Sequence, residues 1–417
     1  MKKFNIPIYL MFIIFLILYS STIAQDSWEV FKPDGLGSSA ATQILEDSKS
    51  NIWFLIYENG VIKYDGNKWT TYTTSNGLVS NKISTIYEDK KGTIWLGSIK
   101  GLMRYNGNSF EVISKNIADR IIEDSSGNIW FGSGVLSSFD GENVFEYTKK
   151  KNNLPDIFIN LFYHDEFNNI MWIGGSKSGM SSFNGKTWQL HNKEPGAPTG
   201  NISCIITDDN GTLWVGTHKG VYSYDGTSWT NYSMEEGLIP DNVLILHKDL
   251  NNNIWAITGK PPSKIIGGAV SVGISALSKS GLSVFYEGKW HPFEEEPSIP
   301  DSRVINIFET SKGEFWFDTF EIGIYRYDGS KWYEFKRNTG FKANHFSSIY
   351  EDSNGNVWFG LGLASGGGEG IGKFDGKNWT FYDKDTGLPS NFIFCILEDS
   401  KGNLWFSTSK GILRYSQ

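Results

Sequence analysis

The stretch EDSNGNVW at residues 351–358 is the most informative part of the sequence, because the same phrase returns along the whole chain. It reads EDSSGNIW at residues 123–130 and EDSKGNLW at residues 398–405. The tryptophans of these and the less regular copies fall at positions 53, 95, 130, 172, 214, 255, 316, 358 and 405. The basic interval is about 42 residues, which is typical of a four-stranded blade in a β-propeller.

Each unit contains signals for four strands. In the second unit we expect strands at residues 82–89, 93–98, 102–105 and 109–113, which we call A, B, C and D. Residues 89–92 (DKKG) favour a tight A–B turn, and Asn106-Gly107 marks the C–D hairpin. A glycine such as Gly101 opens strand C, and an aromatic residue such as Phe110 follows nine positions later on strand D. The unit therefore predicts an all-β protein.

The two ends of the sequence complement each other. Residues 27–31 (SWEVF) match a D strand, whereas the chain stops at residue 417 just after a C strand. One N-terminal and three C-terminal strands would therefore share a closing blade, which removes exposed sheet edges. We expect a single propeller over residues 25–417 with nine blades, and eight blades with one displaced unit as the alternative.

All 16 tryptophans occupy the B or D position of the unit. A buried tryptophan removes about 150–250 Å² from water, so this regularity indicates anchors between blades rather than a platform for stacking sugars. Cys204 and Cys395 share one strand-A position in units five and nine. Those blades would lie across the ring, so we expect two small core residues and no disulfide.

The N-terminus has the pattern of a secretory signal peptide. Lys2 and Lys3 precede an apolar run at residues 6–19, and Thr22-Ile23-Ala24 offers a cleavage site after Ala24. We expect residues 1–24 to be removed, leaving a periplasmic or secreted protein with no membrane span. Retention as an uncleaved anchor is the alternative. Loss of the two lysines would change the net charge from −8 to −10, which disfavours nucleic acid as a partner.

The variable B–C and D–A loops would share one face of the ring, which we call the loop face. Two B–C insertions, at residues 260–279 and in the glycine-rich stretch 360–372, make this face the expected binding site. Ordinary loop variation is the alternative. Candidate ligand-binding residues on it are Lys100, Lys177, His218, Lys219, Lys260, Phe320, Glu321, His345, Glu369 and Lys410.

These candidates suggest two kinds of chemistry. The lysines could form a basic collar for an acidic or hydroxylated ligand, although lysine also suits any exposed turn. Unit seven has Asp318 where glycine is usual, followed by Phe320-Glu321, and an acidic and aromatic pair at a loop would suit a sugar. His218 or His345 could meet Glu321 or Glu369 as a base and its partner. We find no metal-binding or nucleophile motif and expect no catalytic residue, metal or cofactor, and His164 and His247 are expected to be structural.

The unit closely resembles the two-component regulator propeller repeat. Glu398-Asp399 through Trp405, then Gly411 to Tyr415, show its first half, and residues 69–78 show its second. The resemblance implies a periplasmic sensor propeller, often one that responds to glycans. The sequence contains no kinase or response-regulator domain, so we expect the propeller to stand alone. The unit is also loosely similar to streptogramin lyase propellers, which use a His and a Glu with a metal.

Three functions remain open at this point. The first is a non-catalytic propeller that binds or senses a small molecule or oligosaccharide and is linked to two-component signalling. The second is a scaffold for a membrane or periplasmic protein. The third is a lyase-like enzyme, which would require a histidine and a glutamate close together at the channel mouth.

Overall fold

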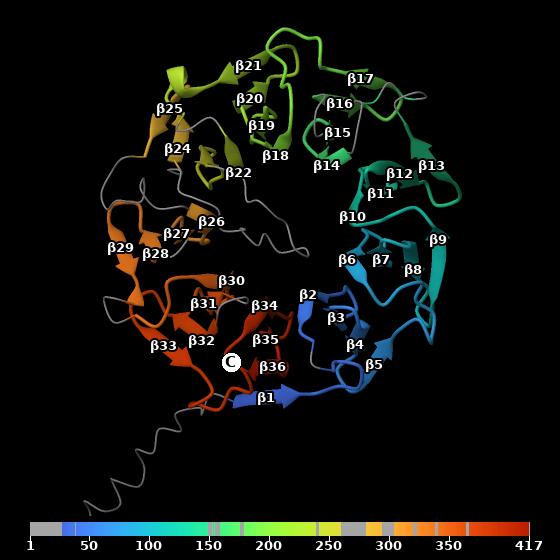
Figure 1. Ribbon diagram of the computed structural model, residues 1–417, viewed down its shortest axis with the longest axis vertical. Helices are drawn as coiled ribbons and strands as arrows, with labels where there is room; N and C mark the ends of the chain where they lie inside the picture. The colour runs from blue at the N-terminus through green and yellow to red at the C-terminus, as the bar shows by residue number, and fades with distance from the viewer. Residues whose placement is uncertain are drawn as a thin grey trace, which may run out of the picture.

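A computed structural model describes residues 27–37, 39–148, 152, 154, 159–175, 179–238, 242–259, 281–293, 304–319, 323–337, 341–363 and 367–416. Within these residues, nine four-stranded antiparallel sheets follow one another around a ring (Figure 1). The predicted signal peptide, residues 1–24, lies outside the described part of the chain. None of the described residues forms a helix of the length and hydropathy needed to cross a bilayer.

Strand bounds are as follows. Blades 1 to 3 contain β2 (Ala41–Glu46), β3 (Ile52–Ile56), β4 (Gly60–Tyr64), β5 (Trp69–Tyr72); β6 (Ile83–Glu88), β7 (Ile94–Ser98), β8 (Gly101–Tyr105), β9 (Phe110–Ser114); β10 (Arg120–Glu123), β11 (Ile129–Ser133), β12 (Val135–Phe139) and β13 (Val144–Tyr147). Blades 4 to 6 contain β14 (Ile159–Asp165), β15 (Ile170–Gly175), β16 (Met180–Phe183), β17 (Trp188–Leu190); β18 (Ile202–Thr207), β19 (Leu213–Thr217), β20 (Gly220–Tyr224), β21 (Trp229–Tyr232); β22 (Val243–Lys248), β23 (Ile254–Thr258), β24 (Gly281–Tyr286) and β25 (Lys289–Pro292). Blades 7 to 9 contain β26 (Val304–Glu309), β27 (Phe315–Thr319), β28 (Ile324–Tyr327), β29 (Trp332–Phe335); β30 (Phe346–Glu351), β31 (Val357–Leu363), β32 (Gly367–Phe374), β33 (Trp379–Tyr382); β34 (Ile393–Glu398), β35 (Asn403–Thr408), β36 (Gly411–Ser416) and β1 (Ser27–Phe31). One 3-10 helix, η1 (Met234–Glu236), follows β21.

The predicted architecture is confirmed. Strand β1 pairs antiparallel with β36, so the N-terminal strand completes the blade formed by β34, β35 and β36. The strands of the second unit lie within one residue of their predicted bounds. In each blade the A strand lies innermost, facing the channel, and the D strand lies on the outer rim (Figure 1). The A–B and C–D turns therefore share one face, the turn face, opposite the loop face.

The repeated aspartate holds both the A–B turn and the tryptophan. In blade 8, Asp352 Oδ1 accepts the backbone N–H groups of Asn354 and Asn356, at 3.0 and 2.8 Å. Asp352 Oδ2 accepts the indole N–H of Trp358 at 2.7 Å. The same aspartate–indole bond occurs in seven blades, at Asp47–Trp53, Asp89–Trp95, Asp124–Trp130, Asp208–Trp214, Asp249–Trp255, Asp352–Trp358 and Asp399–Trp405. Buried polar groups need such partners, which explains why the phrase is repeated.

The tryptophans join neighbouring blades, as expected. All nine B-strand tryptophans are 5% exposed or less. Trp53 of blade 1 packs edge-on against Tyr105 of blade 2, with ring centroids 5.1 Å apart, and Trp358 of blade 8 packs on Tyr415 of blade 9 at 5.0 Å. Each joint is therefore an aromatic core of its own, and Cys204 and Cys395 are free cysteines beside such cores.

Candidate functional site

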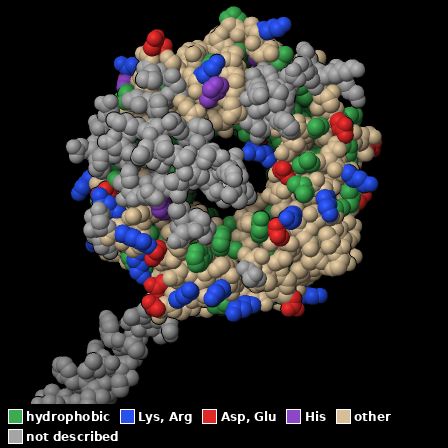
Figure 2. All heavy atoms as spheres, in the orientation of Figure 1, with side chains coloured by type: hydrophobic (Ala, Val, Ile, Leu, Met, Phe, Trp, Pro, Cys, Tyr) green, Lys and Arg blue, Asp and Glu red, His purple; other side chains and the backbone are tan. Residues whose placement is uncertain are grey.

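The three predicted collar lysines occupy equivalent B–C turns in blades 2, 5 and 9. The backbone N–H of Lys100 is bonded to Ser98 Oγ at 3.1 Å, and Lys219 and Lys410 repeat this bond with Thr217 and Thr408. All three side chains are exposed. Because blades 2, 5 and 9 are separated around the ring (Figure 1), the structure does not bring these lysines together, and Figure 2 shows Lys and Arg side chains at separate places around one face of the ring. His218 lies beside Lys219 and close to Gly200, while Lys177, Lys260, Phe320 and Glu321 lie outside the described residues.

The two remaining candidates have partners other than those expected. Glu369 forms an ion pair with Arg337. His345 Nδ1 lies 3.5 Å from Asp318 Oδ1. Asp318 occupies the strand position where glycine is usual, inside β27, and pairs with Asn306. It is 2% exposed at the joint between blades 7 and 8, and burial raises its pKa to about 6.

The glycine-rich stretch of unit eight was expected to be a B–C insertion that forms a loop, and the expectation of a loop is wrong. Strands β31 and β32 extend to Leu363 and from Gly367, so most of the stretch continues the hairpin with a register shift at Leu361–Gly362. Gly368 explains the composition, because a Cβ there would lie 2.1 Å from the carbonyl oxygen of Asn391. The unit-six insertion at residues 260–279 falls outside the described residues.

The turn face carries a second repeated device, which we call the glutamate latch. In blade 9, Glu398 accepts the backbone N–H of Ser353, at 2.7 Å, and its hydroxyl at 2.6 Å, both from the A–B turn of blade 8. The glutamate that precedes the repeated aspartate thus holds the turn of the previous blade. Latches occur at six joints, from Glu46, Glu88, Glu123, Glu309, Glu351 and Glu398.

Three consecutive joints lack the latch. Blades 4, 5 and 6 carry His164, Thr207 and Lys248 at the glutamate position. The turn of blade 4 also holds one extra residue, so seven positions rather than six separate Asp165 from Trp172. Asp165 instead accepts Nδ2–H of Asn168 at 2.8 Å, and the buried indole N–H of Trp172 has no partner among the described residues. The repeat is therefore least regular on this side of the turn face.

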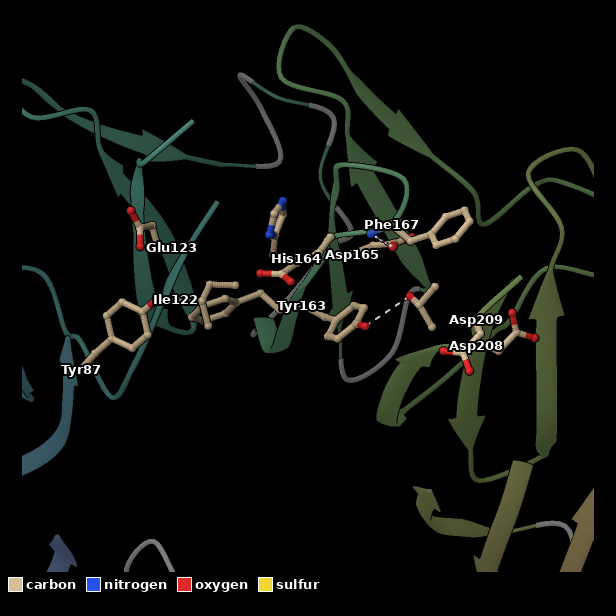
Figure 3. A pocket seen from close by; sticks show the side chains of 12 residues that line it. Tyr87, Ile122, Glu123, Tyr163, His164, Asp165, Phe167, Asp208 and Asp209 are labelled. Carbon is tan, nitrogen blue, oxygen red and sulfur yellow. Dashed lines mark hydrogen bonds between the residues drawn. The ribbon is translucent and has the colours of Figure 1, made fainter. Parts of the chain in front are cut away.

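A hollow of about 640 Å³ lies where the latches are missing. The A strands and A–B turns of blades 2 to 5 form it, with Tyr87 and Glu123 on one side and Asp208 and Asp209 on the other (Figure 3). Its remaining lining residues are Ile122, Phe162, Tyr163, His164, Asp165, Glu166, Phe167 and Thr207. The sequence interpretation missed this hollow because it compared loop lengths. The residue before each repeated aspartate was the signal that could have found it.

Polar contacts fix part of the hollow in place. The Tyr163 hydroxyl donates to Thr207 Oγ1 at 3.2 Å (Figure 3), and burial raises the pKa of Tyr163. Burial likewise raises the pKa of Tyr87, next to Glu123. His164 Nε2 lies 3.2 Å from Asn169 Oδ1. Phenols with raised pKa values stay protonated at neutral pH, so both tyrosines present hydroxyl groups and rings.

One arrangement resembles a catalytic triad, but its position argues against catalysis. Ser182 Oγ lies 2.8 Å from His191 Nε2, and His191 Nδ1 lies 2.8 Å from Glu194 Oε2. Ser182 is 9% and His191 1% exposed, and the imidazole is enclosed by the rings of Trp172 and Trp229. A nucleophile needs room for the carbonyl it attacks. Glu194 Oε2 also accepts the indole N–H of Trp229 in blade 5 at 2.9 Å, so the array packs blade 4 against blade 5.

The lyase hypothesis required a histidine and a glutamate close together at the channel mouth. The His191–Glu194 pair lies in the D–A segment of blade 4, directly after the outer strand β17, and His345 has the carboxylate of Asp318 nearby at a buried blade joint. Groups of three or more His, Cys, Asp or Glu side chains able to hold a metal are absent from the described residues. Neither of these two described pairs therefore reproduces the arrangement expected of a lyase at the channel mouth.

Comparisons with known proteins concern the repeat and the fold. No curated protein matches the chain. Among solved structures, the extracellular domain of a protein described as a hybrid two-component system from B. thetaiotaomicron is 15% identical, with a TM-score of 0.37, over 94% of this chain and 83% of that one. A second extracellular domain from the same organism, described as part of a one-component system, is 16% identical, with a TM-score of 0.32, over 92% of this chain and 57% of that one. Virginiamycin B lyase from Staphylococcus aureus is 12% identical, with a TM-score of 0.41, over 94% of this chain and 100% of that one.

A family model described as the two component regulator propeller matches residues 77–100, 196–219, 340–362 and 387–410. Each match runs through the A and B strands of a blade, in blades 2, 5, 8 and 9. Those segments contain the aspartate, the turn glycine and the B-strand tryptophan described above. In blades 2, 5, 8 and 9, the repeated unit of this ring therefore matches the two component regulator propeller repeat.

Proposed function

We propose that this chain is an exported, non-catalytic propeller that binds a ligand as part of sensing. The observation that carries the proposal is the match of blades 2, 5, 8 and 9 to the two component regulator propeller family model. The signal-peptide pattern of residues 1–24 supports export. A rigid closed ring with one irregular sector supports binding, because a scaffold of this kind holds a site without itself changing shape.

Thermal shift of the mature chain against oligosaccharides, peptides and small ions tests the proposal. A ligand at 100 times its Kd stabilises the folded state by about 2.7 kcal/mol. An unfolding entropy of about 2.1 cal/mol/K per residue over roughly 390 residues converts this to about 3 °C. A saturable shift of that size supports the proposal. No shift across the panel contradicts it, and capture of a membrane protein without any small-molecule response would favour a scaffold instead.

A fluorophosphonate probe tests the non-catalytic part of the proposal. We expect no labelling of Ser182 in the folded chain, because its hydroxyl is buried against His191. Labelling that disappears in the Ser182→Ala variant would contradict this expectation and reopen the enzyme hypothesis.

A further inference from the structure

We infer that the turn-face hollow binds a ligand that carries protonated amine or guanidinium groups on an apolar body, such as a short basic peptide. This inference rests on the proposed function, since it names the class of ligand and the place where it binds. Three independent features support it: the volume of the hollow, its exposed aromatic surface and its charge.

Volume and position come first. About 640 Å³ lies within the roughly 300–1,000 Å³ range of small-molecule sites. The hollow opens where His164 and Thr207 replace the latch glutamate. At latched joints that side chain bridges neighbouring A–B turns, whereas beside the hollow Asn169 is bonded to Ser125 and Asn168 to the carbonyl of Gly211 instead. Departure from a structural repeat at one sector is what a binding site on a rigid ring requires.

Aromatic surface comes second. Phe167 is 63% exposed, which is unusual for a phenylalanine in a short turn. Its ring is held in place beside Gly211, where a Cβ would lie 2.4 Å from Phe167 Cε1. Tyr87 and Tyr163 add two further rings to the lining. Such rings attract cations over their faces and pack against an apolar body.

Charge comes third. Five of the twelve lining residues are carboxylates, and none is lysine or arginine. Asp165 and Asp208 use their oxygens within their own turns. Glu166 and Asp209 are more accessible, with side chains 76% and 61% exposed.

Two lysines at the edge offset part of this charge. Lys90 lies 3.8 Å from Glu166, and Lys248 lies 2.7 Å from Asp209. Five carboxylates against two flanking lysines still leave an excess of three negative charges. An anionic ligand would meet repulsion there, whereas an amine would compete with Lys90 and Lys248 for Glu166 and Asp209.

Two blocked tripeptides of equal size test the inference. Acetyl-Lys-Tyr-Lys-amide and acetyl-Glu-Tyr-Glu-amide are titrated into the mature chain by calorimetry at low salt. Glu166→Gln/Asp209→Asn removes the two accessible carboxylates. Glu142→Gln/Glu287→Gln is the matched control, because both glutamates are exposed in C–D turns of the same face but lie away from the hollow. Phe167→Ala tests the aromatic contribution separately.

We expect the lysine peptide to bind and the glutamate peptide not to bind. Affinity should fall at least tenfold in Glu166→Gln/Asp209→Asn, about threefold in Phe167→Ala and less than twofold in the control. Unchanged thermal midpoints would show that the variants fold. Equal losses in the two double variants would overturn the inference, since they would indicate general attraction to an acidic face. Binding of the glutamate peptide would also overturn it.

The outcome separates this inference from the proposed function. If the lysine peptide fails to bind but another ligand shifts the wild-type midpoint without sensitivity to the hollow variants, the hollow assignment falls and the ligand-binding proposal stands. If no ligand of any class shifts the wild-type midpoint, both fall.

Discussion

Removal of Asp352 should destabilise the ring, chiefly because the buried indole N–H of Trp358 loses its hydrogen-bond acceptor. The Asp352→Ala substitution leaves the indole N–H of Trp358 without its 2.7 Å acceptor, in a side chain that is 0% exposed. An unsatisfied buried donor costs about 1–3 kcal/mol, and the two turn amides, which water can reach, cost roughly 0.5 kcal/mol each. We therefore expect a loss of about 3 kcal/mol, or about 4 °C for cooperative unfolding of roughly 390 residues.

Asp375→Ala is the matched control in the same blade. Asp375 accepts the backbone N–H groups of Lys377 and Asn378, at 2.8 and 2.6 Å, in the exposed C–D turn, but holds no indole. Its removal should lower the thermal midpoint by much less than that of Asp352, because water can replace both bonds at this exposed turn. Differential scanning calorimetry compares the two variants, and the indole N–H resonance of Trp358 reports directly on the lost bond. Equal shifts in the two variants would refute the reasoning.

Blade 7 allows the same reasoning to be tested in reverse. Thr310 replaces the aspartate there, and the indole N–H of Trp316 has no partner among the described residues. The turn is otherwise the same, since Thr310 N–H is bonded to the carbonyl of Glu314 at 2.8 Å. Thr310→Asp should therefore stabilise the ring by about 1 kcal/mol. The gain is smaller than the loss in blade 8 because the new carboxylate would lie near Glu314. A lower midpoint in this variant would show that the aspartate–indole bond does not transfer between blades.

Three further predictions concern the joints and buried groups. Glu398→Gln should weaken the latch to Ser353 by about 1 kcal/mol and speed hydrogen exchange in residues 352–356. His164→Glu should slow hydrogen exchange in residues 124–128. Equal exchange rates in latched and unlatched turns of the wild type would contradict both expectations. Burial raises the pKa of Asp318 from 3.8 to about 6, so the folded state binds this proton more tightly than the unfolded chain, and the free energy of unfolding falls as pH rises from about 4 through about 6. The thermal midpoint of Asp318→Asn should therefore rise relative to that of the wild type across that window. A difference in midpoint that does not depend on pH would contradict this prediction. Burial raises the pKa of Cys204 to about 11 and that of Cys395 to about 12, so iodoacetamide at pH 8 should leave the folded chain unmodified by intact mass and alkylate both thiols after unfolding.

The ring could be predicted in detail from the sequence because its structural chemistry is repeated. The aspartate of EDSNGNVW binds a tryptophan six residues away, and the turn lies between them, so a local phrase determines a whole hairpin. The closing blade followed from counting strands at the two ends. The contact of buried Asp318 with His345 could not be predicted in this way, because His345 belongs to the next blade. The glycines of residues 360–372 misled for a similar reason, since Gly368 admits the carbonyl of Asn391 and Gly370 that of Tyr382, rather than marking a loop.

Positions that are the same in every blade and positions that differ in a few blades carry different information. Where all blades have the same residue, as with the B-strand tryptophans, the chemistry of that residue explains how the ring is held together. Where one sector departs together, the departures need a common cause. His164, Thr207 and Lys248 lie in consecutive blades, and the lengthened turn with exposed Phe167 lies in the first of them. Thr310 in blade 7 is a separate departure, but His164, Phe167 and Thr207 all line one hollow. The turn face of blades 2 to 5, rather than the loop face with its separated lysines, is therefore where the search for a ligand should begin.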